Sequence, residues 1–189
     1  TKRARLAKNS AAMCDGLGAR RILQFLYPEA TREGKLVTMR PASEADSDKL
    51  YEWQLYPETR RYFRNPSAPR KCDHQTWFKR RLADPDCLLN IVEHDGQPAG
   101  MLRLDGTEGM RGKIGDFYEV SILISPNKKK MGIGRAALKL GRKLLPSAVF
   151  RAIVDPENIA SKQLFTSAGY QLLDGVYTQT PAFSEKMLY

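Results

Sequence analysis

Cysteine and histidine are scarce in this chain, and their scarcity argues against several classes of site. The 189 residues include three cysteines, Cys14, Cys72 and Cys87, and two histidines, His74 and His94. The cysteines are odd in number, lie far apart and form no Cys-x-x-Cys pair, so the sequence predicts neither a disulfide framework nor a zinc cluster. We therefore expect no bound metal and a cytoplasmic location.

Long apolar runs are also missing. No stretch approaches the roughly 18 to 20 apolar residues of a membrane-spanning helix. The basic start, TKRARLAKNS, leads into no apolar core of the kind found in signal peptides. We expect no membrane contact. Hydrophobic residues make up 42% of the chain and charged residues 28%, values that are typical of a globular domain.

Acidic residues are outnumbered by basic ones, and the surplus lies mainly at the start of the chain. The formal net charge is +10, from 31 Lys and Arg against 21 Asp and Glu. Residues 1–40 hold nine basic and three acidic residues, which is more than half of the surplus. No basic stripe with interleaved aromatic rings accompanies it, so nucleic acid is not favoured as a partner. An anionic small molecule accounts equally well for the remaining basic patches.

The spacing of apolar residues predicts an α/β fold. We expect a mixed, mostly antiparallel central sheet of about six or seven strands flanked by about four helices. Residues 1–34 are expected to form an N-terminal helical extension and linker, and residues 35–189 a single domain. Strands are indicated near 36–41, 88–93, 99–105, 120–125, 148–154, 170–173 and 183–188, with a hairpin turn at Asp95-Gly96. Helices are indicated near 43–56, 74–82, 135–145 and 158–168.

The stretch from Tyr118 to Leu145 combines a strand, a glycine-bearing basic loop and a helix. The strand, 120–125, is nearly continuous in apolar residues, so we expect both of its faces to be buried. The loop contains three consecutive lysines and then Gly132-Ile133-Gly134. A helix start with glycines and lysines offers free backbone N–H groups and positive charge, which are the parts of an anion site. An ordinary turn is the alternative, because a Gly-x-Gly before a helix is common.

Two motifs resemble those of the GNAT N-acetyltransferase superfamily. Lys129, Gly132 and Gly134 fall on the marked positions of its Arg/Gln-x-x-Gly-x-Gly/Ala pyrophosphate loop, with lysine replacing the usual Arg or Gln. The segment 158–170 resembles the family's later Asn-x-x-Ala/Ser…Tyr…Gly-Phe/Tyr motif. The resemblance implies a GNAT-like fold that binds acetyl-CoA, with the backbone of 121–124 holding the pantetheine arm like an extra strand. It implies these cofactor-binding residues: Ile122, Leu123, Ile124, Lys129, Lys130, Met131, Gly132, Ile133, Gly134, Arg135, Asn158, Ser161 and Phe165.

The resemblance also implies where the proton chemistry lies. Glu119 precedes the central strand, where a family glutamate often acts as the base, directly or through water, and partial burial would suit that role. His94 is a weaker candidate, because its place beside the hairpin turn suggests exposure. The family tyrosine falls on Phe165, which cannot donate a proton. The general acid is therefore unassigned, and water could take its place because a thiolate is a tolerable leaving group.

The segment 53–77 is dense in arginine and aromatic rings, and we expect it to form the acceptor pocket. A nucleotide sugar offers a base on which aromatic rings stack and a diphosphate that arginines bind. The two tryptophans are alternatively core residues. The candidate acceptor-binding residues are Trp53, Arg60, Tyr62, Arg64, His74 and Trp77.

The segment 15–22, DGLGARRI, resembles the C-terminal end of UDP-sugar hydrolases of pseudaminic acid biosynthesis. This resemblance implies that the chain is the rear part of a hydrolase–acetyltransferase fusion. It also implies that the acceptor is the amino group of a UDP-linked amino-deoxy sugar in nonulosonic acid biosynthesis. The alternatives are a protein N-terminal or antibiotic amine as acceptor, and a GNAT-like module that binds acetyl-CoA without turnover.

Overall fold

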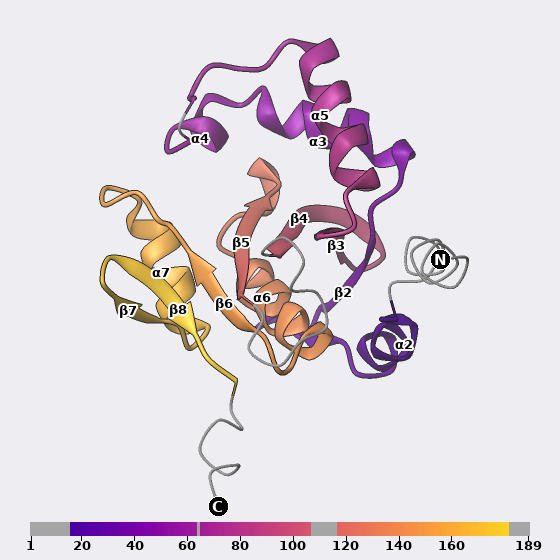
Figure 1. Cartoon of the computed structure of the whole chain (residues 1–189), viewed down its shortest axis with the longest axis vertical. Coiled ribbons are helices and arrows are strands. Elements are labelled where there is room, and N and C mark those ends of the chain that lie inside the picture. Colours follow the sequence, from indigo (N-terminus) through magenta and orange to yellow (C-terminus); the bar gives the residue numbers. More distant parts are fainter. Residues whose placement is uncertain (1–15, 64, 107–116, 182–189) are drawn as a thin grey trace, which may run out of the picture.

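The computed structural model describes residues 16–63, 65–106 and 117–181 of the chain (Figure 1). Within these ranges, no helix is long and apolar enough to cross a membrane. In chain order the elements are α2 (Gly18–Leu26), β1 (Glu29–Ala30), β2 (Leu36–Pro41), the 3₁₀-helix η1 (Glu44–Asp46), α3 (Ser47–Gln54), α4 (Pro57–Arg60), α5 (Lys71–Ala83), β3 (Cys87–His94), β4 (Gln97–Gly106), β5 (Phe117–Ile124), the 3₁₀-helix η2 (Pro126–Lys128), α6 (Ile133–Leu144), β6 (Val149–Ala152), α7 (Ile159–Ser167), β7 (Gln171–Leu173) and β8 (Val176–Gln179).

The strands form one sheet in the order β1-β2-β3-β4-β5-β6-β8-β7. Every neighbouring pair is antiparallel except β5 and β6, which are parallel. The predicted mixed, mostly antiparallel α/β sheet is therefore confirmed. The described residues contain eight strands and six α-helices, somewhat more than the sequence indicates.

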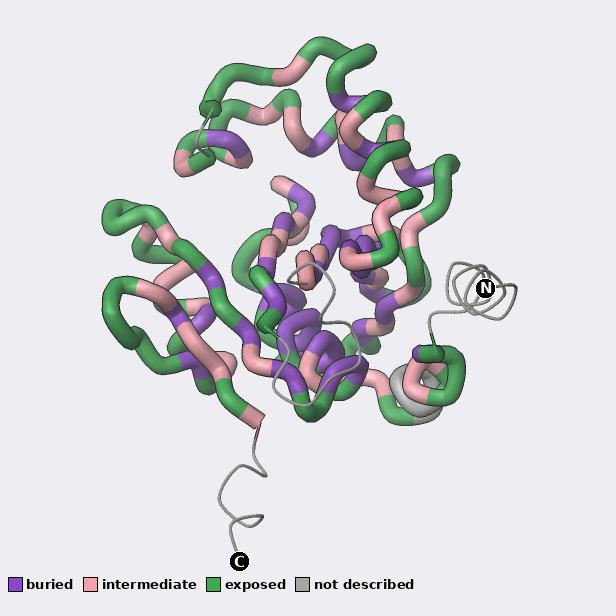
Figure 2. Tube along the Cα trace, in the orientation of Figure 1, coloured by how far each residue is buried: buried purple, intermediate pink, exposed green. Residues whose placement is uncertain are grey.

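The two faces of the sheet carry separate hydrophobic clusters. On one face, Leu102 of β4 packs with α6 in the larger core cluster. On the other face, Met101 of β4 and Leu123 of β5 pack with Phe78 of α5 in the smaller core cluster. Successive side chains of a strand point to opposite faces, which is why β4 supplies both clusters. Buried positions gather around α6 and the strands beside it, whereas α3, α4 and α5 keep many exposed positions (Figure 2).

Helix α6 lies close to the sheet because small residues face it. At Gly141 an added Cβ atom would lie 2.8 Å from a methyl carbon of Leu102. Leu102 has no exposed surface, so that methyl group has little room to give way. Near the other end of the helix, a Cβ atom on Gly134 would lie 3.1 and 3.2 Å from the two methyl carbons of Leu164 in α7. Glycine at these two positions therefore permits the close approach of α6 to β4 and to α7.

Strand β5 loses one of its neighbours partway along its length. It pairs with β4 from Tyr118 to Ile124, but with β6 only from Phe117 to Glu119. Beyond Glu119 the two strands diverge (Figure 1). Among the described residues, no strand pairs with positions 120–124 on the β6 side. The prediction that both faces of 120–125 are buried is wrong: positions 121, 122 and 124 are only partly buried, because they line a cavity.

Two Asp-Gly turns build hairpins in the sheet. Asp95 and Gly96 connect β3 to β4 with φ of 51° and 72°, as the sequence predicts. Asp174 and Gly175 connect β7 to β8 with φ of 49° and 79°. Positive φ at both central residues is the mark of the type I′ turn. The second turn carries the same sequence signal, yet the last strand was predicted at 183–188, which lies outside the described residues.

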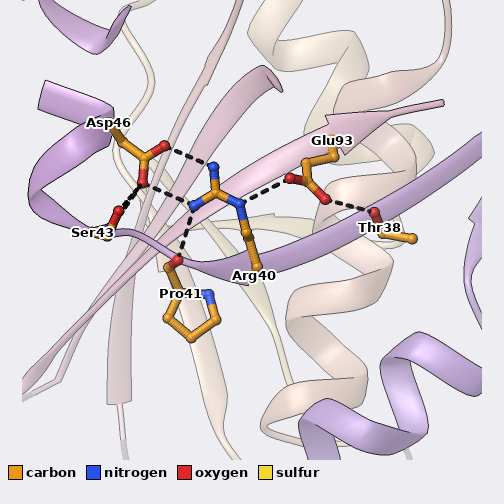
Figure 3. Close-up of polar contacts among 6 residues, drawn as sticks. All are labelled: Thr38, Arg40, Pro41, Ser43, Asp46 and Glu93. Carbon is orange, nitrogen blue, oxygen red and sulfur yellow. Dashed lines mark hydrogen bonds and ion pairs between the residues drawn. The ribbon is translucent and has the colours of Figure 1, made fainter. Parts of the chain in front are cut away.

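Arg40, at the end of β2, ties the sheet to the first helical turn. Its Nη1 and Nη2 donate to the two carboxylate oxygens of Asp46 at 2.9 and 2.7 Å, and its Nε donates to Glu93 at 2.8 Å (Figure 3). Asp46 also accepts from the N–H and the hydroxyl of Ser43, the residue that caps the start of η1. The hydrogen bonds from Arg40 hold the pKa of Asp46 below its usual value. Thr38 donates to the second oxygen of Glu93 at 3.3 Å, so every member of this network has a partner.

The leading segment docks on the residues that follow it. Arg20 of α2 donates to the carbonyl of the last residue of α6 at 3.1 Å. The stretch 28–34, within the predicted extension and linker of residues 1–34, contains β1, and β1 pairs with β2. Glu29 in β1 forms ion pairs with Lys139 at 3.3 Å and Lys143 at 2.6 Å, both on α6. Residues ahead of β2 are thus held against α6.

Candidate functional site

A cavity of about 1350 Å³ is lined by residues from both faces of the sheet. Its walls come from α3, α4 and α5, from the second half of β5, from the basic loop and first turn of α6, and from α7. Pockets for a single small ligand usually measure about 300–1000 Å³. The space therefore suits two ligands side by side.

Most of the predicted site residues line this cavity: Glu119, Ile122, Leu123, Ile124, Lys129, Lys130, Gly132, Ile133, Gly134, Arg135, Asn158, Ser161, Phe165, Arg60, Tyr62, His74 and Trp77. Met131 and Trp53 do not. Met131 packs against the larger core cluster, and Trp53 is 5% exposed within the smaller one, as its alternative interpretation anticipated. Arg64 lies outside the described residues.

Backbone N–H groups collect where the loop turns into α6. Gly132 precedes the helix with φ of 82°, a left-handed conformation that glycine adopts without strain. The first hydrogen bond of the turn runs from the Ala136 N–H to the Gly132 carbonyl at 3.2 Å. The N–H groups of 133–135 therefore have no acceptor within the helix. They lie at the positive end of the helix dipole, where a phosphate binds well.

Four cations surround this helix start, and all line the cavity: Lys128, Lys129, Lys130 and Arg135. In the described part of the chain, none of them forms an ion pair with a carboxylate. Lys139, one turn further along α6, differs because Glu29 engages it. Uncompensated cations beside free N–H groups attract a ligand that carries phosphate.

The second half of β5 leads from this anion site towards Glu119. Its backbone lacks a strand partner on the β6 side, so its N–H and C=O groups can bind an extended, peptide-like ligand. Asn158 caps the start of α7, and its side-chain oxygen accepts a hydrogen bond from the Ser161 N–H at 3.0 Å. These residues fit coenzyme A, which joins a phosphate-bearing nucleotide to a peptide-like arm.

Glu119 lies where β5 and β6 separate. It is the last β5 residue paired with β6, opposite Arg151, and on its other side it faces Asp105 of β4. Its side chain is exposed and lines the cavity, which differs from the partial burial that the sequence suggested. Asp105 forms an ion pair with Arg103 at 2.7 Å, whereas Glu119 forms no ion pair within the described ranges.

Phe165 belongs to an aromatic cluster in the core. It is 3% exposed, and its ring lies 5.0 Å from Tyr170 and 5.9 Å from Tyr177 between centroids. Burial raises the pKa of the Tyr170 hydroxyl, and neither tyrosine lines the cavity. Among the described residues, Tyr62 is the sole tyrosine in the cavity wall, and it lies on the opposite side, after α4. The general acid therefore stays unassigned.

A buried histidine and a glutamine form part of the wall on the side of α3 and α5. Gln54 accepts from Arg60 Nη1 through its Oε1 at 2.7 Å, so its Nε2 faces His74 Nδ1 at 3.1 Å and donates to it. His74 Nε2 then donates to the Ser47 carbonyl at 2.9 Å. Burial lowers the pKa of His74, which favours this neutral form. His74 is thus a fixed element of the wall. His94, which the sequence suggests is exposed, is also buried, at 6%.

Arg60 is a buried cation without an anion. It is 9% exposed and lines the cavity. Its guanidinium donates to neutral oxygens, those of Gln54 and the Asn65 carbonyl, and lies 4.9 Å from the ring centroid of Phe63. Its Nε is buried without a partner, and burial lowers its pKa. No carboxylate pairs with it in the described ranges, whereas Arg103 nearby is neutralised by Asp105.

Sequence reasoning missed several residues of the wall, among them Gln54, Arg103 and Arg32. A glutamine within a helix carries no signal of its own. Arg103 could have been found, because the alternation along 99–105 puts it on the same face as Met101 and Asp105. Arg32 precedes the region that resembles a known family, so no motif draws attention to it.

The sequence and the fold were compared with known proteins. A family model described as an acetyltransferase (GNAT) domain matches residues 37–171. No curated protein matches the chain significantly. Among solved structures, the aminoglycoside acetyltransferase AAC(6')-Ib in complex with coenzyme A and kanamycin superposes with a TM-score of 0.63 at 19% identity, covering 76% of this chain and 94% of that one.

Two further structures are similar. An acetyltransferase from Thermus thermophilus has a TM-score of 0.64 at 19% identity, covering 76% of this chain and 96% of that one. Mycobacterium smegmatis RimJ in complex with CoA-disulfide has a TM-score of 0.63 at 17% identity, covering 86% of this chain and 91% of that one. At such low identity these likenesses concern the fold.

Proposed function

The chain belongs to the acetyltransferase (GNAT) family and uses acetyl-CoA, and we propose that its acceptor is the amino group of a UDP-linked amino-deoxy sugar. The observation that carries this choice is Arg60, a cavity-lining cation that no carboxylate neutralises in the described part of the chain. An isolated buried cation is costly, and an anionic ligand offsets that cost. A nucleotide diphosphate is such a ligand.

Acetyl-CoA supplies an acetyl group activated as a thioester. The N–H groups of 133–135 would bind its phosphates, together with Lys129 and Lys130. The free edge of β5 at 121–124 would bind its pantetheine arm in the manner of an added strand. This leaves the end of the arm near Glu119, between the cofactor and acceptor parts of the cavity.

We assign Glu119 as the group that removes a proton from the acceptor ammonium. Its exposed carboxylate at the strand separation supports this role, as does the neutralisation of Asp105 by Arg103. Because Phe165 carries no proton to donate, we assign water as the donor that protonates the leaving thiolate of coenzyme A.

Charges of both signs line the acceptor side of the cavity. Arg60 and the exposed Arg61 lie there with the acidic Glu58 and Asp73, and Asp73 is paired with Arg70. The buried Arg60 has no carboxylate partner in the described part of the chain, so it is the charge that favours an anionic acceptor, and Tyr62 and Trp77 offer rings for stacking a base. The resemblance of 15–22 to pseudaminic-pathway hydrolases supports the same acceptor. It extends the proposal to a cytoplasmic enzyme of nonulosonic acid synthesis, with a hydrolase domain fused upstream.

A panel of acceptors tests the proposal. The protein would be incubated with acetyl-CoA and, separately, a UDP-amino-deoxy sugar, the same sugar without UDP, kanamycin and a peptide with a free N-terminus. We expect release of CoA and a product heavier by one acetyl group with the UDP-linked sugar, and much weaker activity once UDP is removed. Acetylation of kanamycin or the peptide alone would overturn the choice of acceptor. Coenzyme binding without acetylation of any amine would support the non-catalytic alternative.

A matched pair of variants tests the assignment of the base. Glu119→Gln keeps the size of the side chain and removes its basicity, so we expect kcat to fall about 100-fold. Glu157→Gln is the control, because Glu157 is exposed and lies outside the cavity wall. Full activity of Glu119→Gln across the pH range would exclude Glu119 as the base.

A further inference from the structure

A turn ahead of the matched domain lies at the coenzyme end of the cavity. Residues 29–32 line the same cavity as the basic loop, although the family match begins at residue 37. The two segments are near neighbours. A Cβ atom built on Gly132 would lie 3.9 Å from both the backbone nitrogen of Arg32 and the Cα of Thr31. The wall beside the helix start is therefore made in part by residues outside the matched domain.

The conformation of this turn is fixed by its own hydrogen bonds. The Thr31 N–H donates to the Lys35 carbonyl at 2.9 Å, and the Lys35 N–H donates to the Thr31 hydroxyl at 3.2 Å. The Gly34 N–H donates to the Thr31 carbonyl at 3.0 Å, with Gly34 at φ of 75°. Thr31 is 8% exposed, so these bonds are sheltered from water. Arg32 stands at the tip of a closed turn, in a defined place beside the loop.

The turn is also anchored on α6. Glu29 pairs with Lys143 at 2.6 Å, and Lys143 donates to the Tyr27 carbonyl at 3.0 Å. Glu29 pairs with Lys139 as well, at 3.3 Å. Burial of Glu29 would raise its pKa, but the hydrogen bonds and charges of the two lysines outweigh this and lower it. Charged contacts thus hold β1, just ahead of the turn, against the middle and the last turn of α6.

The charges of this segment leave Arg32 available to a ligand. The negative charge of Glu29 is engaged by the two lysines, so it offers little repulsion to a phosphate. Arg32 is exposed in the cavity wall, and no carboxylate pairs with it in the described ranges. It adds a fifth uncompensated cation to the four that surround the start of α6. A guanidinium binds phosphate oxygens through two parallel hydrogen bonds, which suits this position.

We propose that the turn 31–35 completes the coenzyme site and that Arg32 binds a phosphate at the nucleotide end of coenzyme A. The inference rests on the acetyl-CoA site described above and extends it beyond the matched domain. It assigns to the leading segment a part in binding, in addition to its part in the fold.

Calorimetric titration of the full chain with coenzyme A tests this proposal. We expect Arg32→Ala to weaken binding about five- to tenfold, the loss of one charged hydrogen-bonding contact. Arg32→Lys should recover part of the affinity. Arg80→Ala is the matched control, because Arg80 is an exposed arginine of α5 outside the cavity wall, and it should bind as the unaltered protein does. With saturating acceptor, KM for acetyl-CoA should rise in Arg32→Ala while kcat is unchanged.

Dephospho-coenzyme A, which lacks the 3′-phosphate, identifies the contact. If the penalty of Arg32→Ala disappears with it, Arg32 binds the 3′-phosphate; if the penalty persists, Arg32 binds the diphosphate. Unchanged affinity of Arg32→Ala for coenzyme A would overturn the inference and leave the acetyltransferase function standing. If Arg32→Ala and Arg80→Ala weakened the affinity for coenzyme A equally, the loss would come from the change in net charge, and this too would overturn the inference. A failure of the unaltered protein to bind coenzyme A would overturn both the site and the inference.

Discussion

Two arginines of this protein are held by their surroundings in opposite ways. Arg40 donates to two carboxylates, those of Asp46 and Glu93, and each carboxylate has a further donor (Figure 3). Arg60 is more deeply buried, yet it donates to an amide oxygen and a carbonyl oxygen and keeps its Nε without a partner. The pKa shifts follow this difference, because its carboxylates raise the pKa of Arg40 while burial lowers that of Arg60.

The contrast separates a charge that serves the fold from one that is available to a ligand. The carboxylates around Arg40 offset the desolvation of the cation, so its charge is neutralised within the chain. Around Arg60 the desolvation is offset only in part, by dipoles and by the ring of Phe63. A protein keeps such an arginine when an anion arrives to pair with it. This is the physical basis for choosing an anionic acceptor.

The largest expected effect comes from removing the arginine of the fold. Arg40→Ala leaves Asp46, 7% exposed, and Glu93 facing each other without a cation. We expect the free energy of unfolding to fall by about 2–3 kcal/mol, below the usual cost of breaking a buried pair because the Arg40 side chain is 38% exposed. Urea unfolding measures this change. Below the unfolding transition, kcat/KM should stay near that of the unaltered protein.

Removing the arginine of the cavity should affect activity more than stability. Arg60→Ala deletes two hydrogen bonds but also an uncompensated charge, so we expect a small change in melting temperature. We expect kcat/KM for the UDP-linked acceptor to fall about 10- to 30-fold, roughly the loss of one charged contact to a phosphate. Affinity for coenzyme A serves as the internal control. If Arg60→Ala unfolds the protein as readily as Arg40→Ala does, the contrast between the two arginines fails.

The two networks should also lose stability in different ranges of pH. The pKa of Asp46 is lowered by Arg40, so its contribution is complete above the unfolded value of about 3.9 and is lost as the pH falls through the folded pKa. The pKa of His74, which supports Arg60 through Gln54, is lowered by burial. Its contribution is therefore complete above an unfolded value of about 6.5 and is lost at higher pH than that of Asp46.

Urea unfolding between pH 7 and pH 3 separates these contributions. Asp46→Asn should flatten the loss of stability below about pH 4, and His74→Gln should flatten the earlier loss that begins below about pH 6.5. An unaltered curve in either variant would remove the corresponding network from the account of acid stability.

The smallest effect is expected from an ion pair at the surface. Lys35 and Asp95 lie 3.1 Å apart, but their side chains are 55% and 42% exposed. Lys35→Ala should lower the free energy of unfolding less than any of the variants above, and added salt should reduce that small cost further. A cost close to that of Arg40→Ala would show that burial and shared partners do not explain the strength of the Arg40 network.

The parts of the site that could be predicted are those encoded within short stretches. The strand–loop–helix unit at 118–145 combines an apolar run, two glycines and helical spacing, and each part indicates local structure directly. The turn at Asp95-Gly96 was predictable for the same reason, and so was the turn at Asp174-Gly175. The cap at Asn158 follows from the preference of asparagine for that position.

Contacts between distant segments could not be predicted in this way. Strand β1 has two residues, too few for alternation to show, and it exists because β2 is available to pair with it. Arg60 stands out as an arginine among aromatic rings, but its lack of a carboxylate depends on where α3 and α5 bring Gln54 and His74. The exposure of 121, 122 and 124 depends on the divergence of β6, which the apolar run does not encode.

The small residue at Gly141 gives α6 a mechanical role. The helix is a rigid rod of 12 residues, and the groups that bind phosphate stand at its first turn. Gly141 sets the height of this rod above β4, because an added methyl group would meet the buried Leu102. A larger side chain there should push α6 away from β4 and so displace the phosphate-binding first turn, which lies about two turns along the helix from Gly141. Gly141→Ala should therefore alter coenzyme affinity although it touches no ligand.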